Sequence, residues 1–150
     1  MFGGRSPSLS LLLLPALLLA GCAGGPPAPP QADQEAKRFD APPPGKGALY
    51  VYRPGFMGLA QTIDVTTVGT AVRLGSRTYV RLEAPPGPVE VDCKVGEKNG
   101  TGQLQIADGQ IRYVEVSMTI GWWTPGCEVA EVPPDEGRAA VLLARRIEPQ

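Results

Sequence analysis

Strict alternation of apolar and polar residues marks the clearest predicted element of the chain. The apolar positions are Val89, Val91, Cys93 and Val95, and the polar positions between them are Glu90, Asp92 and Lys94. Successive side chains of a β-strand point to opposite faces, so this pattern predicts a half-buried antiparallel strand. Cys93 then lies on the core side.

Similar patterns divide most of the chain after residue 47 into short strands. We predict strands at 48–53, 61–68, 70–74, 77–83, 89–95, 101–107, 110–119 and 127–132. The first is apolar on both faces, which favours a central place in a sheet. Turns are predicted at Pro85-Pro86-Gly87, Asn99-Gly100 and Asp108-Gly109. This spacing predicts a mainly β fold, a small antiparallel β-sandwich.

The C-terminal segment leaves two structures open. Asp135 could cap a helix that ends near Arg146, where Arg145 and Arg146 would complement the helix dipole. Residues 141–147 are also apolar enough for a strand. We take a short C-terminal helix as the first prediction and the strand as the alternative.

The first 21 residues have the layout of a secretory signal peptide. Arg5 and the amino group give a positive start, and an apolar run of about twelve residues follows, fewer than the roughly 20 that span a bilayer. The run closes with Leu19-Ala20-Gly21-Cys22, which resembles a bacterial lipobox. The alternative is an ordinary cleaved signal with a chance cysteine.

Resemblance to bacterial lipoproteins implies that residues 1–21 are removed and that Cys22 carries a diacylglycerol thioether and an acylated amine, with palmitate as a typical chain. One acyl chain anchors only marginally, whereas two or three hold a protein on the membrane. Ala23, rather than Asp, follows the cysteine. By the usual sorting rule this implies the outer membrane, with the protein facing the periplasm.

Proline dominates the segment between the lipobox and the first strand. Such composition does not bury a core, and it favours extended polyproline II at about 3.1 Å per residue. We therefore predict a disordered Pro-rich linker over 22–46 that holds a folded domain of residues 47–150 away from the membrane. A short helix over 33–39 would be marginal alone.

Composition excludes several classes of function. The chain has 14 Lys and Arg against 15 Asp and Glu and no histidine. Nucleic-acid binding is not expected, because phosphate contacts need concentrated basic residues. Histidine, which is both the commonest general base and the commonest metal ligand, is missing. No spacing of Ser, Cys or acidic residues indicates a catalytic site, so we predict no enzyme activity, no metal and no cofactor.

Two cysteines remain if Cys22 carries lipid. In an oxidising compartment an even pair predicts a disulfide, here between Cys93 and Cys127. Two separate buried thiols are the alternative.

Four apolar residues are candidate contacts for a partner or ligand. Trp122 and Trp123 are adjacent, so in an extended segment they point to opposite faces and one needs a cover or a partner. Alternatively, loops or the terminal helix bury both. Phe56 and Met57 lie in a Gly-containing loop, either a binding loop or one whose Phe packs on the sandwich.

Motifs across residues 46–135 resemble a bacterial domain-of-unknown-function family found in small lipoproteins. They are Ala48-Leu49-Tyr50-Val51-Tyr52-Arg53-Pro54, Val68-Gly69, Gly75, Tyr79, Pro85-Pro86-Gly87, Gly109-Gln110 and Tyr113-Val114. The family is similar in style to PEGA-like sandwich modules. The resemblance implies a small antiparallel sandwich and no activity, substrate or catalytic residue. Thr66-Thr67 departs from the family's usual Asp-Gly type of turn, which leaves the register of that hairpin open.

Two functional hypotheses of different class follow. The first is a non-enzymatic lipoprotein, anchored to the membrane through Cys22, that presents its sandwich to an envelope protein. The alternative is a module for a small molecule or cell-wall glycan. That module would need Trp122, Trp123 and Tyr113 exposed together as a stacking platform. An enzyme that uses carboxylates alone is a third hypothesis, which no spacing supports.

Overall fold

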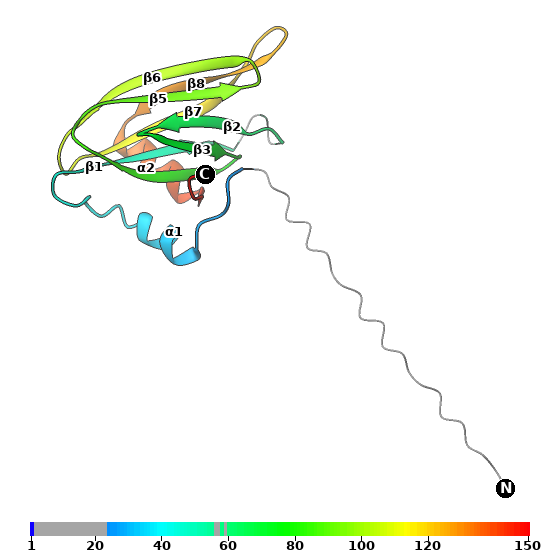
Figure 1. Cartoon of the computed structure of the whole chain (residues 1–150), viewed down its shortest axis with the longest axis horizontal. Helices are drawn as coiled ribbons and strands as arrows, with labels where there is room; N and C mark the ends of the chain where they lie inside the picture. Colours follow the sequence, from blue (N-terminus) through cyan, green and yellow to red (C-terminus); the bar gives the residue numbers. More distant parts are fainter. Residues whose placement is uncertain (2–23, 56–57, 59) are drawn as a thin grey trace.

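The computed structural model of the chain describes residue 1, residues 24–55, residue 58 and residues 60–150. In this part of the chain two β-sheets face each other, and two helices lie against one of them (Figure 1). The prediction of a mainly β sandwich with a short C-terminal helix is confirmed.

The first sheet has the strand order β8-β7-β1-β4-β9. Its members are β1 (Gly47–Arg53), β4 (Thr78–Ala84), β7 (Ile111–Ile120), β8 (Pro125–Val132) and β9 (Arg145–Arg146). β1 is central and buried along its whole length, as its two apolar faces predict. It pairs antiparallel with β4 but parallel with β7, and β9 runs parallel to β4. This sheet is therefore mixed rather than antiparallel throughout.

The second sheet is antiparallel, with the order β3-β2-β5-β6. Its strands are β2 (Ile63–Thr67), β3 (Thr70–Leu74), β5 (Gly87–Val95) and β6 (Lys98–Ile106). The alternation predicted for β5 is confirmed, because its apolar residues are buried and face the other sheet. The open register at Thr66-Thr67 is settled by a two-residue turn at Val68-Gly69, where both residues have positive φ.

The disulfide prediction agrees with the structure, in which Cys93 of β5 is bonded to Cys127 of β8. The bond joins the two sheets. It also explains why the predicted turn at Asn99-Gly100 is wrong. The chain turns at Gly96-Glu97 instead, and Gly100 pairs with Cys93 inside β6. A Cβ at Gly100 would lie 2.5 Å from the Cys127 carbonyl oxygen, so a glycine there leaves room for the disulfide.

Residues 24–46 lie on the sandwich, so for them the prediction of a disordered linker is wrong (Figure 1). Helix α1 (Pro30–Ala36) covers the outer face of the five-stranded sheet, and the Tyr50 hydroxyl donates to the Ala36 carbonyl. The Gly25 amide donates to the carbonyl of Arg73 on β3. Prolines start the helix here, and a few buried apolar side chains with specific hydrogen bonds hold a segment whose average composition predicts disorder.

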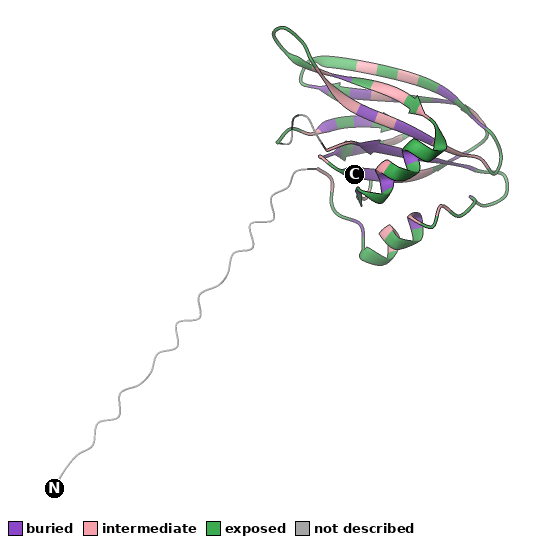
Figure 2. Cartoon of the chain, turned by 180° about the vertical axis from the view of Figure 1, so that it is seen from behind, coloured by how far each residue is buried: buried purple, intermediate pink, exposed green. Residues whose placement is uncertain are grey.

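Helix α2 (Pro134–Leu142) covers the same sheet, followed directly by β9, so helix and strand both form in the C-terminal segment (Figure 2). The predicted cap at Asp135 is wrong. Pro133 occupies the N-cap without a side-chain bond, and Asp135 lies in the first turn. Arg145 and Arg146 lie in β9, beyond the helix, because the chain there pairs with β4.

Gly137 lets α2 approach the sheet closely. A Cβ at this position would lie 2.3 Å from the Tyr113 ring. Although alanine is the better helix former by about 1 kcal/mol, overpacking costs about 1–3 kcal/mol, so Gly137→Ala should lower the free energy of unfolding. Denaturant titration measures the change. Ala139→Ser on the exposed face of the same helix is the control, with an expected change within about 0.5 kcal/mol. Equal stability of Gly137→Ala and wild type would contradict this packing.

Candidate functional site

The β7–β8 hairpin carries the most exposed large apolar side chains in the described part of the domain. Its ladder ends at the pair Ile120 and Pro125, and residues 121–124 connect the strands. Trp122 is 97% exposed, Trp123 95% and Ile120 80%. The alternative in which other elements bury both tryptophans is therefore wrong. We call residues 120–125 the tryptophan hairpin; it projects beyond the end of the sandwich (Figures 1 and 2).

The base of the tryptophan hairpin is held firmly. Cys127, two residues past its end, is bonded to β5, and Met118 is partly buried against the core. Gly121 permits the tight connection, since a Cβ there would lie 2.5 Å from the Thr124 carbonyl oxygen. The sequence from residue 120 to residue 126 has no charged side chain. The hairpin thus displays two indole rings on a braced, uncharged support.

Buried Arg53 connects this base to the loop that follows β1. Its guanidinium donates to the carbonyls of Gln61, Gly58 and Leu74 and lies 3.2 Å from the Met118 sulfur. Burial lowers the pKa of the Arg53 guanidinium. Sequence analysis did not single out this residue, because nothing local distinguishes a buried arginine from a solvated one. Its role in the structure is to hold the loop and the hairpin together.

The remaining predicted site residues fall outside the described part of the chain. Cys22, Phe56 and Met57 are among them, so lipidation and a contact through the Phe56 loop stay predictions.

The three-ring stacking platform does not form. Tyr113 is buried beneath α2 and pairs with Val132, at the far end of the ladder from Ile120 and Pro125. Its ring stacks on Tyr50 at a centroid distance of 5.2 Å. The glycan hypothesis required Tyr113 to be exposed beside both tryptophans, and its geometry is therefore contradicted.

Tyrosines on the outer face of the five-stranded sheet serve to hold α1. The Tyr79 hydroxyl donates to the Asp33 carboxylate at 3.0 Å, and Lys37 and the Arg146 amide donate to the same carboxylate. Burial raises the pKa of Tyr79, and the Asp33 charge raises it further, so the phenol stays neutral. Burial alone would raise the pKa of Asp33, but these three hydrogen bonds outweigh it and lower that pKa.

Asp33→Asn should therefore destabilise the protein most at neutral pH. A carboxyl whose pKa is lowered by folding contributes stability above its unfolded value, about 3.9, and that contribution is lost as the pH falls through the folded value. We expect a loss of about 1–3 kcal/mol at pH 7, since three donors lose a charged acceptor. The difference from wild type should shrink below about pH 4. Denaturant titrations of both proteins across this range measure it, and a difference independent of pH would contradict the assignment.

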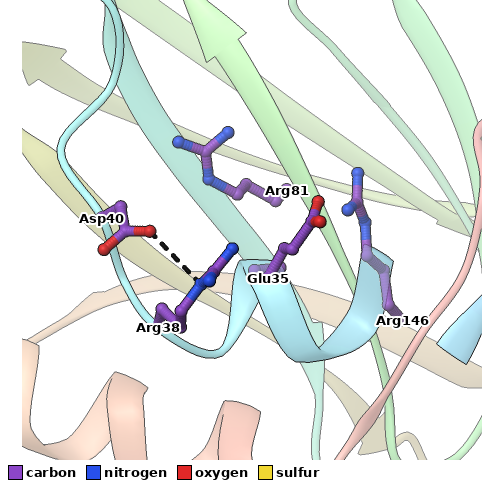
Figure 3. A pocket seen from close by; sticks show the side chains of 6 residues that line it. Glu35, Arg38, Asp40, Arg81 and Arg146 are labelled. Atoms are coloured by element: carbon purple, nitrogen blue, oxygen red, sulfur yellow. Dashed lines mark ion pairs between the residues drawn. The ribbon is translucent and has the colours of Figure 1, made fainter. Parts of the chain in front are cut away.

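A charged groove of about 220 Å³ lies between α1 and β4 (Figure 3). It is lined by Glu35, Ala36, Arg38, Asp40, Arg81 and Arg146. Arg38 pairs with Asp40, and the Arg146 guanidinium donates to the carbonyl of Ala32 in α1. Because acidic side chains face the arginines, the groove does not concentrate charge of one sign. Its contacts hold the helix on the sheet.

Within the described residues no group of three or more Cys, Asp or Glu side chains is placed to bind a metal ion. In the same part of the chain, no helix has the length and apolar character needed to cross a membrane.

Comparison with known proteins finds a similarity to a bacterial protein. The chain is 25% identical over 130 residues to an uncharacterized protein of Haemophilus influenzae, covering 84% of this chain and 76% of that protein. No protein-family model matches the chain. The resemblance to a lipoprotein family of unknown function therefore stays a prediction.

Proposed function

We propose that this chain is a lipid-anchored lipoprotein of the outer membrane, facing the periplasm, that acts by binding and not by catalysis. The lipobox at Cys22 supports the anchor, and the tryptophan hairpin supports the binding role. The exposure of Trp122 and Trp123 is the observation that carries the proposal.

Two exposed indole rings at adjacent positions of the chain favour a contact over a purely structural role. Folding normally removes such rings from water, because each contributes a large apolar area to a core or an interface. Here they lie at the tip of a hairpin whose base is fixed by a disulfide and by Arg53. A braced support keeps the rings in place before a contact forms, which lowers the entropy cost of binding.

Three ionisable groups with shifted pKa values have structural roles, which favours a binding role over catalysis. Tyr79 and Asp33 hold α1, and the Tyr52 hydroxyl donates to Glu115. Burial, reinforced by Glu115, raises the pKa of Tyr52 and keeps it neutral. Each of these groups has a structural partner, and none of them lies on the tryptophan hairpin.

Photo-crosslinking in living cells tests the proposal. A photoreactive amino acid at position 123 should give adducts with an envelope component. The matched control is the same amino acid at position 105, because Gln105 is exposed on β6 near the opposite end of the sandwich, beside Pro88. Adducts at position 123 and few at 105 are expected. No adduct at position 123, or equal yields at the two positions, would overturn a binding role for the hairpin.

A further inference from the structure

We propose that the tryptophan hairpin inserts into the surface of the same membrane that anchors Cys22, so that one end of the sandwich touches the bilayer at two points. The inference rests on the proposed function and names the lipid surface as the partner of the hairpin.

The point where the chain enters the domain lies at the end that carries the hairpin. Gly24 packs against Gly75, where an added Cβ would lie 3.0 Å from the Gly75 nitrogen, and the carbonyl of Gly75 accepts a bond from the Thr78 hydroxyl. Thr78 pairs with Arg53, the last residue of β1. β1 runs parallel to β7, so Arg53 lies toward the hairpin end, where it contacts Met118. Figure 1 shows the start of the folded part and the hairpin at the same end of the sandwich.

This entry point places the anchor close to the domain. Cys22 precedes Gly24 by two residues in the sequence. An extended residue spans at most about 3.6 Å, so the two residues of chain between Gly24 and a lipid on Cys22 add at most about 7 Å. Because residues 24–46 pack on the sandwich, they do not act as a spacer. A chain anchored at Cys22 therefore holds this end of the sandwich against the membrane.

The chemistry of the hairpin suits a bilayer surface. Tryptophan favours the boundary between headgroups and acyl chains, because its ring is apolar and its N–H reaches polar groups. The hairpin has no charged side chain that would have to leave water. Leu143 is 81% exposed and lines a cavity with Arg53 and Arg77, which places a further apolar side chain at this end.

Basic side chains lie at the same end of the sandwich as the tryptophan hairpin. Lys98 begins β6 next to Gly126, and Arg77 and Arg145 lie beside Thr78; all three are exposed. The exposed acidic residue Glu97 lies in the turn before Lys98. Cations at this end favour binding to anionic headgroups by about 1 kcal/mol each when they lie near the membrane surface. The short distance to the anchor favours lipid over a protein partner, because the lipid surface is already within reach.

Intrinsic fluorescence tests the inference, because Trp122 and Trp123 are the two tryptophans of the chain. The mature lipidated protein would be placed in vesicles of phosphatidylethanolamine and phosphatidylglycerol with brominated acyl chains. We expect emission to shift to the blue and to fall roughly twofold, as for rings about 5–10 Å into the headgroup boundary. In the control, Trp122→Phe and Trp123→Phe are combined with Gln105→Trp, and the emission should be neither shifted nor quenched.

Other outcomes separate this inference from the proposed function. Unshifted and unquenched emission together with protein adducts at position 123 would overturn membrane insertion and leave the binding role standing. Unshifted emission without any adduct would overturn both. Equal quenching of the hairpin tryptophans and of the tryptophan at position 105 would also overturn the inference, since the contact would not be confined to one end.

Discussion

Replacing Cys93 and Cys127 together by alanine is expected to lower the free energy of unfolding by about 4 kcal/mol. The disulfide closes a loop with a sequence separation of 34 residues, and a loop of that length restricts the unfolded chain by about this amount. Both cysteines are buried where β5 of one sheet meets β8 of the other. Denaturant titration of the double variant and of the wild type measures the loss.

Alkylation gives a second, independent test of the same disulfide. In unfolded, unreduced protein purified from the envelope, neither Cys93 nor Cys127 should react with iodoacetamide until a reductant is added. The matched control is wild-type protein under reducing conditions, whose stability should fall to that of the double alanine variant. Free labelling of both thiols before reduction, or equal stability of oxidised and reduced protein, would contradict the disulfide.

Cys22→Ala should move the protein from the membrane fraction to the soluble periplasm. Without the thiol no diacylglycerol is attached, and each lost acyl methylene removes about 0.8 kcal/mol of membrane affinity. Palmitate labelling and membrane fractionation measure the change. Because the tryptophan hairpin adds a weaker contact, a small residual membrane fraction is expected, and it should disappear when Trp122→Ala and Trp123→Ala are added. Unchanged palmitate labelling and membrane association of Cys22→Ala would contradict the anchor.

Regular alternation was sufficient to predict most strands, because it reflects a geometric period of two residues. The inward positions of β5 follow from the sequence in this way, whereas the central place of β1 follows from a continuous apolar run that leaves neither face polar. The prediction of a turn at Asn99-Gly100 was wrong for a non-local reason. A strong local turn signal was outweighed by the need for a residue without a side chain beside the disulfide.

The N-terminal segment shows where composition misleads. Its proline content predicts an extended linker, yet Asp33 and Ala36 make contacts with residues far along the chain. Those partners become neighbours only through the fold, so the average composition of the segment does not reveal these contacts. The consequence for the proposed function is large, since the lipid that we propose at Cys22 would hold the sandwich at the membrane instead of at a distance.

The exposure of Trp122 and Trp123 was likewise open in the sequence. Whether other elements cover them depends on how far β7 and β8 extend beyond their neighbours, which local patterns do not determine. No local signal marked the change: in the sequence the apolar series Val114, Val116, Met118 continues to Ile120, yet Ile120 is 80% exposed. Burial stops where the hairpin leaves the sandwich.

Hydroxyl-radical footprinting of the two tryptophans in native envelopes tests the binding role of the hairpin most directly. Oxidation of Trp122 and Trp123 would be compared between intact envelopes and the purified Cys22→Ala protein in solution, with buried Tyr113 as the internal reference for low labelling. We predict strong oxidation of both rings in solution and marked protection in the envelope, whether lipid or protein covers them. Equal oxidation of the tryptophans in both samples would contradict a hairpin that acts by contact.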